Sequence, residues 1–478
     1  MIDNRRGIKM KNLKLNYFYK NKTVFKITTY FIIILMILFE LLNDNIFKTN
    51  PLSIDMSSNK VYSLSKETKS FIKSINKDVK ITILNSKTNF VSNNYYFANI
   101  DTVINEYSKL NKISVNYINI ENDLQDLTDY PTNELNKNDI IIQCDQNYLI
   151  YPADELFSNQ DKNTIISSIE QQITSGIYSV LFGIKNVSII QENNKKNNAS
   201  YLINLLKNNG YNVNIFSNLK DGIDTSPDML ILFSPYEDFS QEDTALIDQF
   251  LEQGKQSGKA LICIPNYSVN SKTPNLNNLF NKLGINIDEG IVYDPNHIYK
   301  NNIGDFFITA EYVDNEFLYP SINLNKPVVL PSSRPISIIG NKNKNVKEIL
   351  KFSSSSGKWL QDEQGDEQYL QFGNIPAVVL SSDIDENNLS HVMVISSSSS
   401  FAKERLFDYD SNNYMFYLNL FNILSGKSDS PIIGFEVISK QNSSFINILK
   451  LIITCIIVLL IIWILYFIFV IRRTKRHE

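Results

Sequence analysis

Two long apolar runs, one near each end of the 478-residue chain, dominate its pattern of hydrophobic and polar positions. Residues 448–471 read ILKLIITCIIVLLIIWILYFIFVI and carry no charge after Lys450, and residues 24–42 contain the core YFIIILMILFELL. About 20 apolar residues are enough to cross the hydrocarbon core of a bilayer as a helix. Both runs therefore predict transmembrane helices.

The first run also has the order of parts found in a secretory signal peptide, a basic segment followed by an apolar one. However, its apolar stretch is long, no Ala-x-Ala-like cleavage site follows it, and residues 43–51 are polar and bulky. We therefore interpret residues 24–42 as an uncleaved transmembrane helix.

Basic residues flank both runs on the side of the chain ends, which predicts the topology. They are Arg5, Arg6, Lys9, Lys11, Lys14, Lys20, Lys22 and Lys26 at the first run, and Arg472, Arg473, Lys475 and Arg476 after the last. We expect a two-pass protein of a bacterial cell membrane. Both tails, residues 1–23 and 472–478, would be cytoplasmic, and residues 43–447 would lie outside.

The segment between the spans is acidic, although the whole chain has a formal net charge of only -4. Residues 43–447 contain 33 basic and 47 acidic residues. This balance excludes a nucleic-acid binder. The basic ends, in contrast, favour contact with the anionic lipid of the inner leaflet.

Residues 43–163 alternate between helical and strand-like patterns and predict a first external α/β domain. Ser63 or Ser65 is placed to cap a helix whose first turn contains Glu67. The other expected elements are strands at 79–84, 113–120, 139–143 and 147–151, the last two as a hairpin, and a helix at 97–110. Residues 164–185 are expected to link this domain to the next, with a helix at 164–182.

Residues 186–424 predict a second external α/β domain with a Rossmann-like, doubly wound sheet, because strands and helices alternate there. Ser240 and Asp243 form a variant of the capping box. The expected strands are 187–190, 213–216, 229–233, 260–264, 291–293, 376–381 and 391–395, the last two as a hairpin; the expected helices are 200–209, 240–252, 276–283 and 414–424. Residues 296–347 predict long loops with short strands, and residues 425–447 a largely polar linker into the last span.

Two short motifs resemble catalytic or phosphate-binding sequences, but a structural role explains each better. Residues 254–260 read GKQSGKA, with the wrong spacing for a phosphate loop, no Ser or Thr for magnesium, and a preceding helix where a strand is required. Ser63-x-x-Lys66 and Ser70-x-x-Lys73 match the nucleophile motif of penicillin-recognising enzymes. The partner sequence Lys-Thr-Gly is absent from the chain, so helix capping is the preferred interpretation.

A third motif, Asp408-x-Asp410-x-Asn412, resembles the start of a calcium loop. Asn413 replaces the glycine of the sharp turn, and Asn419 stands where the bidentate Glu belongs. We therefore interpret the motif as a solvated turn before a helix.

The remaining polar candidates do not assemble into a catalytic or metal site. His297, His391 and His477 lack neighbours at metal-ligand spacing. The serine run at residues 396–400 lacks a Gly-x-Ser-x-Gly elbow. We therefore expect no catalytic residue, no cofactor and no metal, and a protein that is not an enzyme.

The three cysteines show no spaced framework. Cys455 lies in the last apolar run, and Cys144 and Cys263 lie in strand-like stretches. Two buried free thiols are the favoured interpretation for the latter pair, and a disulfide between them stays open.

Seven segments carry a joint resemblance: KVYSLSKETKSFIKSINKDVKITIL, the helix at 170–176, PDMLILFSPYEDFSQEDTALIDQFLEQGKQSGKALICIP, LNNLFNKLGINIDEGIVYDP, IPAVVLSS, HVMVISSSSSFAKERL and NNYMFYLNLFNILSG. In this order, over most of the chain, they resemble the GldG-like auxiliary component of ABC-type transport systems, a family named from bacterial gliding motility. The resemblance implies a non-ATPase membrane partner of a multi-span ABC permease and, through it, of a cytoplasmic ABC ATPase.

The chain departs from this family at two loops. Residues 191–194 read QENN where such proteins often carry Gly-His-Gly-Glu, and residues 396–399 are serines where they often read Gly-Asp-Ser-Asp. Such loops lie at strand ends, where α/β folds place ligands. No small-molecule site is therefore carried over from the family.

The expected function is that of an accessory subunit whose outer domains capture, guide or gate cargo at the permease. Two helices make a poor conduit, and the C-terminal span has no charge between residues 451 and 471, so it offers no pathway of its own. The chain also lacks a phosphate loop. A stand-alone, membrane-anchored cell-surface binding or scaffolding protein is the alternative. A membrane-tethered hydrolase is disfavoured, since no nucleophile has a base at recognisable spacing.

Overall fold

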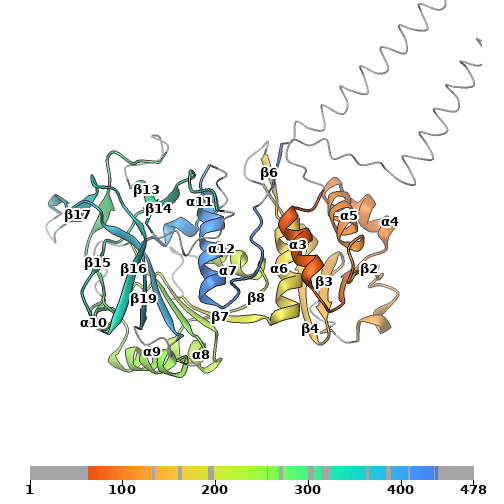
Figure 1. Cartoon of the computed structure of the whole chain (residues 1–478), viewed down its shortest axis with the longest axis horizontal. Helices are drawn as coiled ribbons and strands as arrows, with labels where there is room; N and C mark the ends of the chain where they lie inside the picture. The colour runs from red at the N-terminus through yellow and green to blue at the C-terminus, as the bar shows by residue number, and fades with distance from the viewer. Residues whose placement is uncertain are drawn as a thin grey trace, which may run out of the picture. The chain divides into compact units, whose positions relative to one another are not determined.

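The computed structural model describes most of residues 63–439 (Figure 1). The residues within that range that are not described are 129, 132–134, 160–163, 192–198, 256, 268–272, 300–305, 314–321, 342, 362–364, 384–388, 407, 409 and 435. The chain divides into two compact units, Met1–Val61 and Tyr62–Glu478, and every described residue lies in the second. None of the described helices is long and apolar enough to cross a membrane. Both predicted spans, 24–42 and 448–471, lie outside the described residues.

The first part of the described chain is a four-stranded sheet with helices packed on it. Its strand order is β2-β1-β3-β4, with β1 and β2 parallel and the other pairs antiparallel. The strands are β1 (Val79–Ile83), β2 (Ile113–Tyr117), β3 (Asp139–Cys144) and β4 (Asn147–Pro152). The helices are α3 (Lys66–Ser74), α4 (Lys87–Asn93) and α5 (Tyr95–Ser108), with short 3-10 turns η1 (Leu124–Leu127) and η2 (Ala153–Leu156). Ser65 caps α3 by accepting a 3.1 Å bond from Thr68 N, so the predicted cap is confirmed.

A nine-stranded sheet of order β14-β13-β16-β19-β20-β10-β9-β7-β8 forms the second part. The strands from β20 to β8 are parallel, and those from β14 to β20 are antiparallel. The parallel strands are β7 (Lys185–Ile190), β8 (Tyr211–Phe216), β9 (Met229–Phe233), β10 (Ala260–Ile264) and β20 (His391–Ile395). The antiparallel strands are β13 (Phe307–Tyr312), β14 (Val328–Pro331), β16 (Lys344–Lys351) and β19 (Pro376–Asp383).

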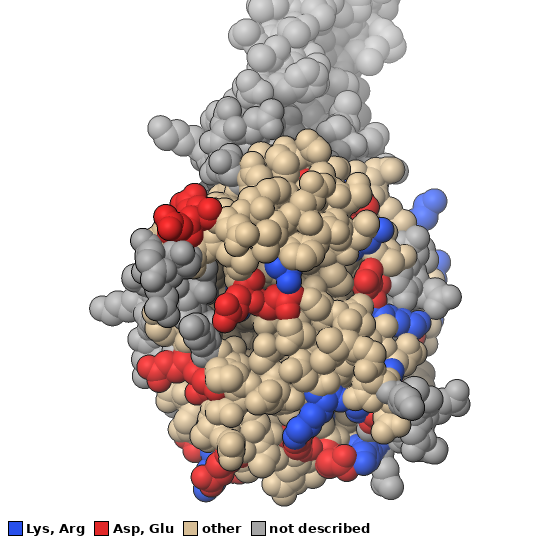
Figure 2. Space-filling view, turned by 90° about the vertical axis from the view of Figure 1, so that its left-hand side faces the viewer, with Lys and Arg blue, Asp and Glu red and all other residues tan. Residues whose placement is uncertain are grey.

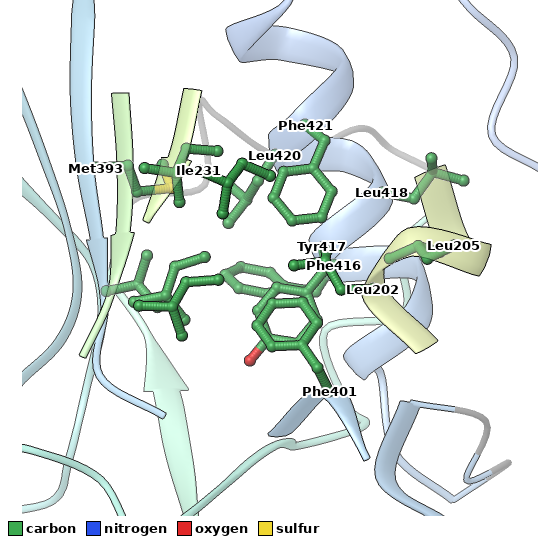
Figure 3. Close-up of a cluster of buried hydrophobic side chains, with 14 of the residues drawn as sticks. Leu202, Leu205, Ile231, Met393, Phe401, Phe416, Tyr417, Leu418, Leu420 and Phe421 are labelled. Carbon is green, nitrogen blue, oxygen red and sulfur yellow. The ribbon is translucent and has the colours of Figure 1, made fainter. Parts of the chain in front are cut away.

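Helices cover both faces of the parallel half, because its strands alternate side chains between two cores. On β9, Ile231 packs with α7 (Ser200–Lys207) and α12 (Asn413–Leu424), whereas Leu230 and Leu232 pack with the helices of the other face. Those helices are α8 (Leu219–Asp224), α9 (Gln241–Gln253) and α10 (Pro274–Lys282). Figure 3 shows the first core, in which the rings of Phe401 and Tyr417 stack at 4.3 Å.

Three small sheets complete the described fold. Their orders are β11-β15, β12-β17-β18 and β21-β6-β5. Their strands are β5 (Phe157–Asn159), β6 (Thr164–Ser167), β11 (Ile285–Ile287), β12 (Ile291–Tyr293), β15 (Ile336–Ile338), β17 (Gly357–Gln361), β18 (Glu367–Gln371) and β21 (Glu436–Ser439). The remaining helices are α6 (Ile169–Phe182), α11 (Lys403–Leu406) and the 3-10 turn η3 (Ser399–Phe401).

The mixed α/β class and most predicted elements are confirmed, including the β3–β4 and β19–β20 hairpins and the capping box of α9. The short strands β13, β14 and β15 also lie in the region of weak pattern, as expected. The doubly wound arrangement, however, covers only the parallel half of the large sheet. Four antiparallel strands extend that sheet on one side.

The helix predicted at 164–182 is wrong in its first turn. Residues Thr164–Ser167 form strand β6, and the helix begins at Ile169. The β-branched Ile165 and Ile166 pair with β5 on one side and β21 on the other, and β-branched side chains favour this extended geometry.

The linker predicted at 425–447 is also wrong over its described part. Lys427, Ser430, Ile432 and Ile433 are buried, and Glu436–Ser439 pairs with β6. Polar composition gave a wrong prediction because the Lys427 ammonium finds its hydrogen-bond partners, Ser179 and the carbonyl of Asn209, inside the protein rather than in water.

Candidate functional site

Helix α6 is the most unusual element of the fold, because every residue from Ile169 to Val180 is buried although seven of these twelve residues are polar or glycine. Residues four apart lie on one face of a helix. The sequence IEQQITSGIYSVLF therefore places Glu170 and Thr174 on one stripe, and Gln171, Ser175 and Ser179 on another. We call these two stripes and their partners the α6 junction.

The first stripe binds the beginning of the described chain. Glu170 Oε1 accepts hydrogen bonds from the backbone nitrogen of Ser65 at 2.7 Å and from its hydroxyl at 2.6 Å. Thr174 Oγ1 lies 3.1 Å from Thr68 Oγ1 and 2.6 Å from the hydroxyl of Tyr107. Glu170 thus bonds the N-cap residue of α3, and Thr174 bonds α3 and α5 together.

The second stripe binds the end of the described chain. Gln171 Nε2 donates to Asn209 Oδ1 at 2.7 Å, and Gln171 Oε1 accepts from the backbone nitrogen of Ile433. Ser179 Oγ accepts a 3.0 Å bond from Lys427 Nζ. Both Ile433 and Lys427 belong to the segment that returns after α12.

Lys427 is the centre of this second contact and is 1% exposed. Its ammonium donates to the carbonyl of Asn209 at 2.8 Å and lies 4.1 Å from the ring centroid of Tyr211 and 5.8 Å from that of Tyr178. No carboxylate pairs with it among the ion pairs of the described residues. Burial lowers the pKa of Lys427 to about 7, and the nearby Lys185 acts in the same direction.

Two glycines permit the close packing of α6. A Cβ at Gly176 would lie 2.7 Å from Ile142 Cδ1 and 2.8 Å from the ring of Tyr151. Gly210 has a φ of +77°, and a Cβ there would lie 2.3 Å from Ser179 Oγ. A larger residue at either position would separate α6 from one of its two neighbours.

A further contact of the same region is the small sheet in which β6 pairs with β21. Since β6 directly precedes α6, the first and the last described segments of the chain meet at one place. Ser179 Oγ and Lys427 Nζ lie 3.0 Å apart in the α6 junction, but both residues are buried, at 0% and 1% exposure, so this hydroxyl and amine serve packing. The geometry of the junction holds the two ends of the described body together.

The carboxyl edge of the parallel strands, where the sequence placed a serine run, is a packed polar region. Ser396 Oγ donates to Ser333 Oγ at 3.1 Å, and Ser397 Oγ donates to the carbonyl of Pro331. Ser400 Oγ donates to the carbonyl of Ser397 at 2.7 Å and accepts from the hydroxyl of Tyr417 at 2.6 Å. The hydroxyls of Ser396, Ser397 and Ser400 are thus hydrogen-bonded to backbone carbonyls and neighbouring hydroxyl groups, as in a structural turn.

Arg334 lies at the same edge and is 4% exposed. It donates to the carbonyl of Asp288 from Nε at 3.1 Å and from Nη2 at 2.8 Å, and to the carbonyl of Asn266 from Nη1 at 3.3 Å. Of the other loop singled out in the sequence, residues 191–194, only Gln191 is described; its Oε1 accepts from Ala199 N at 3.3 Å. Arg334 therefore ties loops together at the edge where a ligand would bind.

The other sequence candidates have structural partners as well. Lys259, in the glycine-rich connection, donates to the carbonyls of Pro227 and Ser226 at the amino edge of the sheet. Asp408 accepts from Tyr299 OH at 2.8 Å and from Asp410 N at 3.0 Å. The glycine-rich segment is a helix-to-strand connection, as expected. The Asp408 motif does form a turn before α12, but the expectation that this turn is solvated is wrong, because Asp408 and Asn412 are buried. Among the described residues, no group of three or more His, Cys, Asp or Glu residues could hold a metal ion.

The sequence missed a cluster around Asp294, which is fully buried. Asp294 accepts from Ser353 Oγ and Ser355 Oγ at 2.6 Å each, and His297 Nδ1 lies 3.3 Å from its Oδ1. Burial would raise the pKa of Asp294, but the hydrogen bonds from these two serines and from His297 hold it below its ordinary value. Both serines bond the carboxylate rather than the imidazole, so the cluster is not arranged as a nucleophile with its base. About sixty residues separate its two halves in the sequence, which is why spacing could not reveal it.

A polar pocket of about 290 Å³ opens at the amino edge of β20. Each of its three carboxylates has a lysine partner, so the pocket is balanced in charge; the pairs are Asp248 with Lys282, Glu252 with Lys255, and Asp383 with Lys344. Figure 2, which faces the side of β17 and α10, likewise shows acidic and basic side chains interspersed over the described surface.

The two described cysteines, Cys144 and Cys263, are free and buried, which confirms the favoured interpretation. Burial raises the pKa of the Cys263 thiol to about 12 and also raises the pKa of Cys144. Both thiols are therefore protonated and unreactive near neutral pH.

Comparisons with known proteins show which parts of this fold recur. Residues 184–314 match the model of a family described as an ABC-type uncharacterized transport system, and residues 58–156 match a domain of unknown function (DUF7088). No curated protein matches the chain. These two segments contain the parallel strands β7–β10 and the four-stranded sheet, respectively.

Two solved structures are similar over about half of the chain. The N-terminal domain of mmIFT52 is 14% identical with a TM-score of 0.39, over 50% of this chain and 97% of that one. A Thermoplasma acidophilum protein described as part of a GMP synthase is 8% identical with a TM-score of 0.30, over 51% of this chain and 96% of that one. The match of residues 184–314 supports an accessory role in an ABC-type transport system and confirms, at the level of that transport auxiliary family, the resemblance seen in the sequence.

Proposed function

We propose that this chain is a non-ATPase accessory subunit of an ABC-type transporter. In this proposal, residues 24–42 and 448–471 anchor it in a bacterial cell membrane beside a multi-span permease, which binds a cytoplasmic ATPase. The body between the spans lies outside the cytoplasm and captures, guides or gates cargo at the mouth of the permease. Membership of the GldG-like subgroup and a Rossmann-like topology of the second α/β domain remain predictions.

The observation that carries this proposal is the α6 junction. One helix bonds Ser65, which follows the first predicted span, and Lys427 and Ile433, which precede the second. One helix thus ties the two ends of the described body together, so that a shift at either end would be passed on to the other. This coupling is what an accessory subunit beside a moving permease requires.

The buried serine run and the structural use of Arg334 support a non-catalytic role. A stand-alone cell-surface binding or scaffolding protein would also use an external body. It would not need a fixed link between its two anchors, and the family match favours the transporter.

Photo-crosslinking in the native membrane tests the proposal. A photoreactive residue at Thr454 or Ile462, in the second predicted span, should give an adduct with a multi-span permease. The same residue at Leu389, which is 50% exposed on the body, is the control for non-specific capture. Absence of span adducts, together with a protein that always purifies alone in mild detergent, would leave the stand-alone alternative.

A further inference from the structure

The described chain ends very close to its second predicted span. Ser439 is the last described residue, and eight residues separate it from Ile448. Nine steps along an extended chain reach at most about 30 Å. The sheet β21-β6-β5 must therefore lie within that distance of the start of the span, if the span is in the membrane as proposed above.

Three aromatic side chains form a cluster beside this sheet. The rings of Tyr96 and Phe157 have centroids 5.0 Å apart, and those of Tyr95 and Tyr96 are 5.9 Å apart. Tyr95, at the first position of α5, is 58% exposed, whereas Tyr96 and Phe157 also pack against the core below them. The cluster is thus supported from inside and open on its outer side.

The strand register shows how close this cluster is to Ser439, the last described residue. Phe157 pairs with Ser167, which on its other side pairs with Glu436. Two strand spacings separate Phe157 from Glu436, about 10 Å, and three residues along β21 separate Glu436 from Ser439, also about 10 Å. In Figure 1, β6 and α5 lie at the end of the described body opposite to α8 and α9. Residues 440–447, which join Ser439 to the predicted span, can extend at most about 30 Å. The distance from the cluster to Ser439 is well below this length.

Tyrosine is the residue type that suits the boundary between water and lipid, because its ring is apolar and its hydroxyl is polar. The neighbouring turn η2 carries exposed acids, Asp154 and Glu155, so attraction to anionic lipid would not hold the cluster there. Its chemistry fits the headgroup region of a bilayer through apolar and hydroxyl contacts rather than through charge.

We propose that Tyr95, Tyr96 and Phe157 form a surface that seats the external body on the headgroup region of the bilayer. This inference rests on the membrane anchoring of the proposed function. It adds a third point of attachment to the two spans and fixes which end of the body faces the membrane.

Tryptophan quenching in phosphatidylcholine vesicles, with bromines near the headgroup end of the acyl chains, tests this surface on the full chain. The chain has two tryptophans, Trp359 and Trp463. In a Trp463→Phe parent, Tyr95→Trp should add emission that the brominated lipid quenches, while the signal of Trp359 stays unchanged. Adding anionic lipid should not increase the quenching.

Phe182→Trp in the same parent is the matched control. Phe182 is 62% exposed and packs against Tyr178 at 4.8 Å, so it resembles Tyr95 in exposure and in having a ring neighbour. It stands at the far end of α6, whose 14 residues extend about 21 Å from β6. Its emission should not be quenched.

Trp463 in the otherwise unaltered protein separates the two hypotheses when the lipid is brominated near the methyl end of the acyl chains. Position 463 lies near the middle of residues 448–471, so its quenching by this lipid reports insertion of the second span. Quenching of Trp463 without quenching of Tyr95→Trp would overturn the docking surface and leave the anchoring intact. A crosslink from position 95 to the permease would then assign the cluster to that partner. Equal quenching at positions 95 and 182 would also overturn it, and a Trp463 that is not quenched would overturn the anchoring itself.

Discussion

Lys427 Nζ donates a 2.8 Å hydrogen bond to the backbone carbonyl of Asn209, a residue 218 positions earlier in the chain. No side-chain charge balances the ammonium among the ion pairs of the described residues; its neighbours are Ser179, the rings of Tyr178 and Tyr211, and the repelling Lys185. A lysine held this way makes the stability of the α6 junction depend on pH.

The sign of this dependence follows from the lowered pKa of Lys427, about 7 in the folded protein against an ordinary value of 10.5. Between these values the unfolded chain binds the proton and the folded one does not, so the free energy of unfolding rises with pH from about 7 to about 10. Lys427→Met should remove this slope in thermal melts of the full chain in detergent. Lys207→Met, at an exposed lysine of α7, should keep it; an unchanged slope in Lys427→Met would contradict the prediction.

Glu170→Ala should loosen the beginning of the body. The change leaves the backbone nitrogen of Ser65 without its acceptor, and an unsatisfied buried donor costs about 1–3 kcal/mol. Hydrogen exchange of the amides in α3 should accelerate more than that of β9 in the large sheet. Glu67→Ala, at an exposed residue of the same helix, is the control and should have a small effect. Equal exchange in both variants would show that Glu170 does not hold α3.

The serine run offers a matched pair that distinguishes structure from catalysis. Ser400→Ala leaves the hydroxyl of the buried Tyr417 without its partner and should lower the free energy of unfolding by about 1–3 kcal/mol. Ser398 Oγ has no hydrogen-bond partner in the described structure, so Ser398→Ala should be close to neutral.

We expect neither ATP nor ester hydrolysis by the purified protein. Robust turnover that one Ser→Ala change abolishes would refute the non-catalytic interpretation.

Cysteine labelling in intact cells tests the expected topology. An impermeant maleimide should label Ser271→Cys in the body and not Asn4→Cys in the first tail. The background should be low, because Cys144 and Cys263 are buried thiols with raised pKa values, and Cys455→Ser removes the remaining one. Labelling of position 4 with none at position 271 would reverse the orientation.

Sequence patterns predicted the strands that are buried on both faces. β9 and β10 are short apolar runs, and the burial of all five residues in each strand follows from their place inside the parallel half. The start of helix α9 was also predicted from the sequence, since Ser240 and Asp243 form the capping box that their spacing indicates.

Two strands were not predicted, because they lack a regular alternation of apolar and polar residues. β18 reads EQYLQ and has one partner. β16 lies between β13 and β19, reads KNVKEILK and has a register shift between Glu348 and Leu350. Their position depends on pairing with distant strands, which local periodicity does not contain.

The role of α6 could not be predicted for a related reason. Its polar residues resemble those of a solvated linker, and only tertiary structure shows that Glu170 faces Ser65 while Gln171 faces Asn209. The partners lie 105 and 38 positions away in the chain. The periodicity of the helix does not depend on partners this far away in the chain, so it could not predict these contacts.

The pairing of β6 with β21 has a consequence for the order in which the protein is made. β6 is synthesised about 270 residues before its partner β21, so its edge and the second stripe of α6 stay open during translation. The junction can close only after residues 427–439 have been synthesised, and these lie directly before the last apolar run. A chain stopped after Leu424 would lack the contacts of Lys427 and Ile433 and would present an unpaired strand edge. Completion of the fold is therefore tied to synthesis of the segment that directly precedes the last apolar run.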